Sequence, residues 1–187
     1  MDIGKGLMRS VLGGVALWCA VVVPATGLPL FSLSQTQSGG VVHVSVTASG
    51  ASDLFGYQFS LNFDPAVLHA TTVSEGPFLA TGGATFFDNG TTDNTVGQVS
   101  FIFDTLLSAV AGVNGGGVLA TIDLSALRFP TLTSLSLSDV LAVDSHGNVL
   151  ATQTQGLTFS VAEPSMLALL AIALVGITLS LRRHGRA

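Results

Sequence analysis

The chain has 187 residues, which is the size of a single domain. Charged residues make up 9% of it, against about 25% in an average soluble protein. Six lysine and arginine residues are too few for a phosphate-binding surface, so the composition excludes nucleic-acid binding. It also excludes a coiled coil, which needs charged residues beside its apolar seam.

The distribution of charge divides the chain into three parts. Residues 28–160 contain nine acidic side chains and one basic side chain, Arg128, while the other basic residues lie in the two terminal segments. This pattern predicts processing and sorting signals at both ends of an acidic domain. The expected parts are a signal peptide at 1–27, a domain at 28–160 and a sorting tail at 161–187.

The N-terminal segment has the features of a secretory signal peptide. Lys5 and Arg9 precede an uncharged, almost wholly apolar run at 11–23, and small residues follow. An uncleaved anchor helix is the alternative, although the run is shorter than the roughly 20 residues of a typical span. Cleavage after Ala25 and cleavage after Gly27 both fit, and the sequence does not choose between them. Cys19, the only cysteine, lies in this segment, so cleavage would leave a mature protein without thiols or disulfides.

The middle segment alternates apolar and polar residues with the period of β-strands, and Gly, Pro, Asn and Asp clusters separate the repeats. No stretch keeps a helical period for more than about two turns, although short helical turns are expected at 66–69 and 106–112. We therefore predict an all-β fold, an antiparallel β-sandwich of eight or nine strands. The alternating apolar positions are Phe31, Leu33, Val42, Val44, Val46, Tyr57, Phe59, Leu61, Phe63, Val99, Phe101, Phe103, Val118, Ala120, Ile122, Leu124, Leu135 and Leu137.

Five segments in order resemble the cohesin domain family. Residues 56–68 are similar to its third-strand region, in which an alternating strand ends in an aromatic-Asp-Pro turn. The similarity continues at 73–76, 97–103, 117–124 and 139–148. The resemblance implies a jelly-roll-like, nine-stranded sandwich. It also implies two activities, docking of a dockerin-like partner and polysaccharide binding.

The domain contains no recognisable catalytic constellation. His43 and His69 are interpreted as solvated strand residues, and no common spacing relates them to His146. Asp144, Ser145 and His146 are the residue types of a catalytic triad, but neighbours in one tight turn cannot adopt its relay geometry. We expect no enzymatic activity and no cofactor.

The sequence offers weak support for two kinds of ligand, calcium and polysaccharide. Residues 88–94 gather oxygen donors, but they match no complete calcium loop, so we expect a plain hairpin loop and no metal site. Polysaccharide binding usually needs exposed aromatic rings, yet the phenylalanines lie mostly in the inward phase of the strands. Phe55, Phe78 and Phe87 are the expected exceptions. These observations favour binding of a partner or matrix component through a sheet face, without indicating which face.

The C-terminal segment predicts a transmembrane helix. Residues 166–181 are uncharged and apolar, and Arg182 and Arg183 follow directly. With its flanking residues the run approaches the shortest spanning length, about 17 residues. The positive-inside rule places these arginines in the cytoplasm and the middle domain outside the inner membrane.

This tail, 161–187, resembles the PEP-CTERM sorting signal, in which a Pro-Glu-Pro motif precedes a short transmembrane helix and an arginine-rich end. Glu163, Pro164 and Ser165 fall on the last motif positions, and Arg182 and Arg183 on the basic end. Ala162 stands where the motif has its first proline. The resemblance implies an exosortase-type membrane protease as a partner, with cleavage close to Pro164.

The sequence thus predicts an exported, non-catalytic protein of the cell envelope or extracellular matrix, anchored transiently in the membrane by its C-terminal helix. Its sandwich is expected to bind a protein partner or an extracellular polysaccharide. The alternative is a purely structural component of the matrix with no specific ligand.

Overall fold

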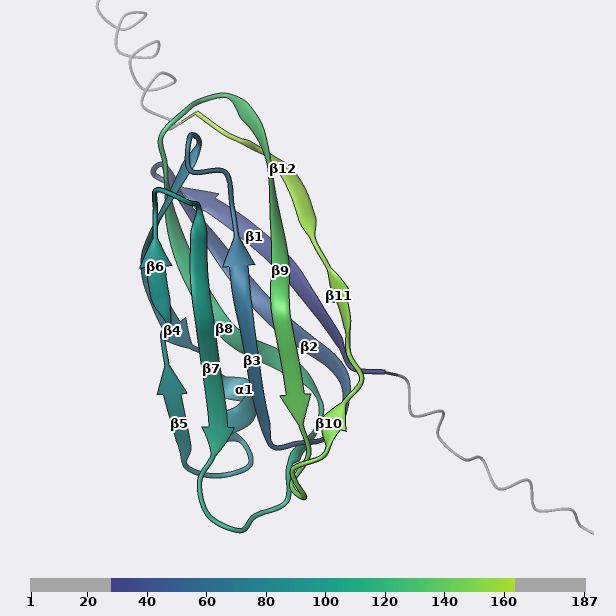
Figure 1. Cartoon of the computed structure of the whole chain (residues 1–187). Helices are drawn as coiled ribbons and strands as arrows, with labels where there is room; N and C mark the ends of the chain where they lie inside the picture. Colours follow the sequence, from purple (N-terminus) through teal and green to yellow (C-terminus); the bar gives the residue numbers. More distant parts are fainter. Residues whose placement is uncertain (1–27, 164–187) are drawn as a thin grey trace, which may run out of the picture.

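The computed structural model describes residues 28–163, which form two β-sheets packed face to face (Figure 1). This confirms the predicted all-β sandwich. The expected signal peptide at 1–27 and the expected transmembrane helix at 166–181 lie outside the described residues.

The first sheet has five strands in the order β11-β1-β2-β8-β4. The bounds of these strands are Leu30–Ser38 for β1, Val41–Leu54 for β2, Leu68–Glu75 for β4, Val113–Ala126 for β8 and Gln153–Gln155 for β11. All neighbours run antiparallel except β1 and β11, which pair in parallel. The parallel pair departs from the purely antiparallel sandwich predicted from the sequence.

The second sheet has seven strands, in the order β10-β9-β3-β7-β5 with β12 also paired to β9 and β6 also paired to β7. Its pairs are all antiparallel. The strand bounds are Gly56–Asn62 for β3, Thr85–Asp88 for β5, Thr91–Asp93 for β6, Gln98–Leu106 for β7, Thr131–Val143 for β9, Val149–Leu150 for β10 and Leu157–Val161 for β12.

The strand count is higher than predicted because several strands are short. Strands β5, β6, β10 and β11 each contain four residues or fewer, too few to show a period-2 pattern. The last stretch of chain also changes sheets, which divides it into β11 and β12. Gly156 lies at this crossing, where an added Cβ would approach the Leu135 carbonyl oxygen to 2.9 Å.

The single helix of the described chain, α1 at Pro77–Ala80, is not where short helical turns were expected. Proline at the first helical position is favourable because its missing N–H would have no partner there. Near the predicted helical turn at 66–69, Val67 and Leu68 donate to the Asp64 carbonyl, which closes a single turn before β4 begins at Leu68. Residues 107–112 form an irregular connection.

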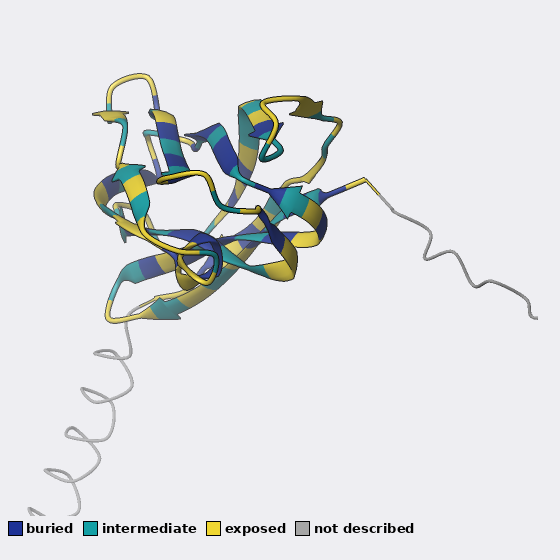
Figure 2. Ribbon diagram, turned by 90° about the horizontal axis from the view of Figure 1, so that it is seen from below, coloured by how far each residue is buried: buried dark blue, intermediate teal, exposed yellow. Residues whose placement is uncertain are grey.

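The core lies between the two sheets, and buried and exposed residues alternate along the strands (Figure 2). Strand β3 fits the predicted pattern closely, since Tyr57, Phe59 and Leu61 are at most 3% exposed. The Tyr57 ring stacks on Phe59 at 5.9 Å and meets Phe31 of the other sheet edge-on at 6.4 Å. Burying a side chain of this size stabilises a fold by about 1.5–3 kcal/mol. The buried cluster begins at Phe31 and ends at Val161, so residues 28–163 contain their own core.

Candidate functional site

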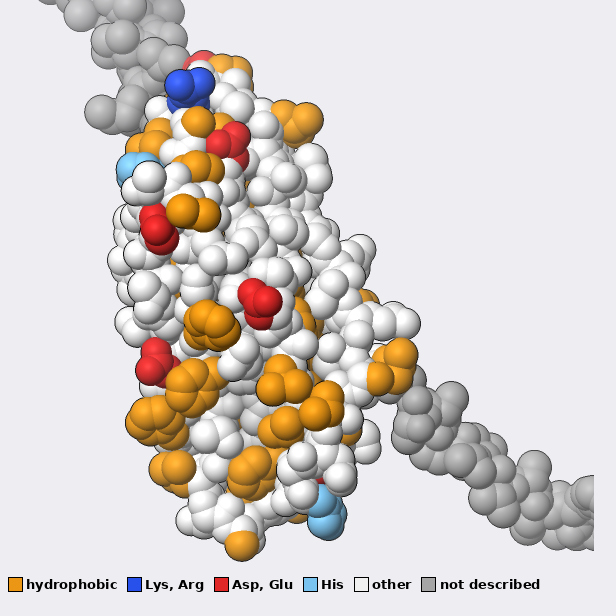
Figure 3. Space-filling model, viewed as in Figure 1, with side chains coloured by type: hydrophobic (Ala, Val, Ile, Leu, Met, Phe, Trp, Pro, Cys, Tyr) orange, Lys and Arg blue, Asp and Glu red, His pale blue; other side chains and the backbone are white. Residues whose placement is uncertain are grey.

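Apolar side chains gather on the outer face of the seven-stranded sheet, over the lower half of β5, β7, β3 and β9 as drawn (Figure 3). Phe86 on β5, Phe101 on β7 and Leu141 on β9 are 52%, 58% and 40% exposed. Phe103, half-buried on β7, packs against Phe86 with ring centroids 5.8 Å apart. We call these four residues the apolar face. Contiguous exposed apolar surface of this kind marks interaction sites.

A shallow hollow of about 170 Å³ lies within the apolar face. Its walls include Phe103 and Thr105 from β7 and Leu141 and Val143 from β9, and Gly56 of β3 lies between them. A Cβ at Gly56 would lie 3.2 Å from the Thr105 hydroxyl oxygen and 3.3 Å from a Val143 methyl group. The missing side chain of Gly56 therefore keeps the floor of the hollow open.

A β-bulge in β7 turns Phe101 outward. Phe59 of β3 pairs with Ile102, but Leu61 pairs with Val99, so β7 has one extra residue at this point. Phe101 has φ of 57°, an uncommon backbone conformation for a bulky residue. The sequence predicted Phe101 in phase with Val99, and that prediction is wrong because the bulge shifts the alternation by one residue.

The prediction that Phe55, Phe78 and Phe87 are the exposed phenylalanines is also wrong. Phe78 is buried at 7% exposure, and Phe55 and Phe87 are half-buried against the core. On β5 it is Phe86 rather than Phe87 that faces outward. A four-residue strand gives too short a pattern to fix which of two adjacent aromatic residues points to the core.

The same bulge places an acidic residue in the core beneath the apolar face. Asp104 is 1% exposed, and neither carboxylate oxygen has a hydrogen-bond partner among the described residues. The neighbouring Tyr57 hydroxyl donates instead to the Leu119 carbonyl, at 2.5 Å. Burial, followed by the charge of Glu75, raises the pKa of Asp104 to about 7. Asp104 was not identified from the sequence because the uninterrupted alternation placed it on the solvent side.

The turn that carries Asp144, Ser145 and His146 is closed by hydrogen bonds and has no triad geometry. The Ser145 hydroxyl donates to Asp53 at 2.7 Å, which holds the pKa of Asp53 below its ordinary value. The Nδ1 atom of His146 lies 3.3 Å from the Ser145 hydroxyl and 3.7 Å from the Asp53 carboxylate. A relay needs the serine and the carboxylate on opposite ring nitrogens, so this arrangement cannot transfer a proton between them.

Asp53, Asp144 and His146 also bring three potential metal-ligand atoms within 4.8 Å of one another. Both carboxylates already accept backbone hydrogen bonds, Asp53 from Gly112 and Asp144 from His146 and Asn148. Three donors fall short of the six to eight oxygens that calcium takes. These three side chains lie close together because Asp53 and Asp144 accept the hydrogen bonds that stabilise the turn.

The oxygen donors of residues 88–94 serve local turns. Asp88 accepts from the Gly90 amide at 2.8 Å, and Asp93 accepts from the Thr95 amide at 2.8 Å. Asn94 exchanges two hydrogen bonds with the backbone of Ala70 on β4. The expected hairpin loop is only partly correct, because Thr91–Asp93 form the strand β6 and both β5 and β6 pair with β7 rather than with each other.

The two other histidines of residues 28–163 lie apart from this turn, on the five-stranded sheet. His43 on β2 pairs with Asp123 on β8 across the outer face, with Nδ1 and Oδ1 2.7 Å apart. His69 lies on β4, opposite Ser125. Both are partly or fully exposed, as expected for solvated strand residues.

Of the expected sorting motif, Glu163 is the last described residue, and it is exposed. The described chain ends after β12, at the upper end of the sandwich (Figure 1). Pro164, Ser165, Arg182 and Arg183 lie outside the described residues. Within 28–163, no helix has the length and apolar character needed to cross a membrane.

Residues 30–158 match the family model of the cohesin domain. Among solved structures, the third cohesin ScaC from Acetivibrio cellulolyticus, in complex with the ScaB dockerin, is 15% identical with a TM-score of 0.59. That match covers 73% of this chain and 100% of the other. The non-cellulosomal cohesin from Archaeoglobus fulgidus is also 15% identical, with a TM-score of 0.55 and coverage of 73% and 93%. No curated protein sequence gives a significant match.

Proposed function

The chain belongs to the cohesin domain family, and we propose that its sandwich is a non-catalytic module that binds a dockerin-like protein partner through the apolar face. The observation that carries this proposal is the group of exposed Phe86, Phe101 and Leu141 on one sheet face, together with the hollow that Phe103 and Leu141 line. A sheet surface is already ordered before binding, so little conformational entropy is lost when a partner docks.

The charges beside the apolar face suit a basic partner. Exposed Asp88 and Asp139 lie on β5 and β9, the same strands that carry Phe86 and Leu141. Arg128 is the only basic residue of residues 28–160. A partner with an apolar anchor and flanking lysine or arginine residues would therefore be complementary in shape and charge.

Polysaccharide binding through the same face is the weaker candidate. Sugar rings stack on flat aromatic platforms, but the Phe86 and Phe103 rings are tilted by 40° to each other. Tyr57, the only tyrosine in the chain, is buried in the core. We therefore favour a protein partner and treat a polysaccharide as an outcome of the test.

Titration calorimetry of residues 28–163 against purified dockerin modules and soluble polysaccharides tests the proposal. We expect saturable 1:1 binding of at least one dockerin module. Leu141→Ser should weaken it by about tenfold or more, the effect of losing a buried interface anchor. Thr121→Ala, on the outer face of the other sheet, is the matched control and should leave the affinity unchanged. Binding of a polysaccharide alone, or of no ligand, would contradict the proposal.

We further propose that the protein is exported and sorted by an exosortase-type protease. The support is the distribution of charge along the sequence and the position of exposed Glu163 two residues after β12. Protease added to intact spheroplasts should degrade the domain, and the mature protein should end close to Pro164. Survival of the domain until lysis would contradict export, and a protein that still ends at Ala187 would contradict sorting.

A further inference from the structure

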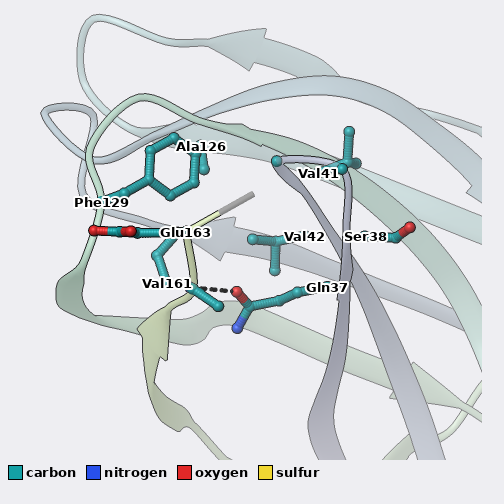
Figure 4. A pocket seen from close by; sticks show the side chains of 11 residues that line it. Gln37, Ser38, Val41, Val42, Ala126, Phe129, Val161 and Glu163 are labelled. Carbon is teal, nitrogen blue, oxygen red and sulfur yellow. Dashed lines mark hydrogen bonds between the residues drawn. The ribbon is translucent and has the colours of Figure 1, made fainter. Parts of the chain in front are cut away.

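One side chain holds the C-terminal end of the folded domain in place. Gln37 lies on β1 of the five-stranded sheet, and its amide group meets the backbone that leaves β12 of the other sheet. Its Nε2 donates to the Ser160 carbonyl at 2.9 Å, and its Oε1 accepts from the Ala162 amide at 2.7 Å. Figure 4 shows the second of these bonds. We call this pair of hydrogen bonds the Gln37 clamp.

The clamp lies at the point where the chain becomes exposed. Val161 is 1% exposed, whereas Ala162 and Glu163 are exposed. A hollow of about 250 Å³ surrounds the clamp, with the β1–β2 turn on one side and Phe129 on the other (Figure 4). The backbone between Ser160 and Ala162 is therefore fixed to both sheets.

The chemistry of the clamp depends on the residue at 162. Proline has no backbone N–H, so a proline at this position could not donate to Gln37. The sorting motif that the tail resembles has its first proline here, and this chain has Ala162. Because Ala162 stands in place of that proline, its backbone N–H can donate the shorter of the two hydrogen bonds to Gln37.

We propose that the Gln37 clamp sets the boundary of processing, keeping the chain up to Ala162 on the sandwich and leaving only the peptide bonds from Glu163 onward open to cleavage. A protease needs its substrate backbone free and extended, so segments held by backbone hydrogen bonds become available only when they open locally. The inference deepens the proposed sorting, because it places the cut at the C-terminal side of Glu163.

Limited proteolysis of the full chain in detergent micelles, with proteinase K and intact-mass analysis, tests the clamp without any sorting enzyme. The wild-type domain should end at Glu163 or beyond. Gln37→Ala removes both bonds and should permit cuts within β12 roughly ten times faster, because each hydrogen bond makes a modest contribution to holding the end. Gln37→Glu keeps the acceptor for Ala162, and Ala162→Pro removes only that bond, so both should give intermediate rates.

Gln155→Ala, at an exposed position on β11, is the matched control and should leave the cleavage boundary unchanged. Thermal melting identifies any variant that loses the whole fold rather than its end. Equal cleavage within β12 for the wild type and Gln37→Ala would overturn the clamp. Because the protease is added, this result does not depend on whether the host cuts the tail, and an uncut tail in the host would overturn only the sorting proposal.

Discussion

Asp104 is a carboxyl group in a core that offers it no hydrogen bond from the described residues. The side chains that affect its pKa are Glu75 on β4 and Tyr57 on β3, and neither supplies a positive charge. The Asp104 pKa of about 7 in the folded state lies above the unfolded value of 3.8. Between these values the folded state keeps a proton that the unfolded state has lost, so stability falls as pH rises through this window.

We predict that Asp104→Asn removes this pH dependence. The wild-type free energy of unfolding should fall by about 1.4 kcal/mol per pH unit between pH 4 and 7 and then level off. The variant should show little of this fall and should be the more stable protein at pH 8. Urea unfolding at a series of pH values measures the effect, with exposed Asp139→Asn as the control that keeps the wild-type slope. A variant with the wild-type slope would show that Asp104 does not titrate as described.

Phe101 combines backbone strain with exposure on the apolar face. A left-handed backbone costs a bulky residue about 1–2 kcal/mol, while glycine loses about 0.5–1 kcal/mol through chain entropy. Phe101→Gly should therefore leave stability unchanged or raise it by up to about 1 kcal/mol. The same change should weaken partner binding, whereas Phe86→Ala should weaken binding without any gain in stability. Chemical unfolding and calorimetry together check this, and a loss of stability above about 1 kcal/mol in Phe101→Gly would contradict it.

At the scale of elements, the sequence predicts the strands where alternation is unbroken and fails where a strand is bulged or short. Strand β3 follows the predicted pattern through Tyr57, Phe59 and Leu61. Strand β7 does not, because the bulge at Phe101 reverses the phase, and no residue type in this strand signals it. The candidate face therefore could not be assigned from sequence. Its residues converge only through strand pairing, as Phe103 of β7 and Leu141 of β9 do on either side of β3.

Two turn glycines have similar φ angles but different surroundings. Replacing each with alanine separates the free-energy cost of a steric clash from the cost of the left-handed backbone. Gly97, which precedes β7, has φ of 83°, and an added Cβ would lie 2.2 Å from the Phe63 carbonyl oxygen. Gly147, in the β9–β10 turn, has φ of 80° and open space around it. We predict that Gly97→Ala destabilises the domain by more than about 2 kcal/mol and Gly147→Ala by about 1 kcal/mol. Equal losses of unfolding free energy would contradict the close contact at Gly97.

The whole molecule has two unlike faces. On the outer face of the five-stranded sheet, Ser34, Ser45, Thr121 and Ser74 pair in one row across four strands. Small hydroxyl groups of this kind remain solvated and offer no large apolar anchor. The seven-stranded sheet instead exposes the apolar face. We therefore propose that the apolar face binds the partner and that the opposite face remains in contact with the solvent.

Site-specific photo-crosslinking in the full chain, in its own host, tests this assignment most directly. A photoreactive phenylalanine analogue replaces Phe86 or Leu141 on the apolar face, and Ser34 or Thr121 on the opposite face. We predict crosslinks from Phe86 and Leu141 to a protein that contains a dockerin-like module, and none from Ser34 or Thr121. Crosslinks from the Ser34 and Thr121 positions at equal or higher yield, or from none of the four, would contradict a binding site on the apolar face.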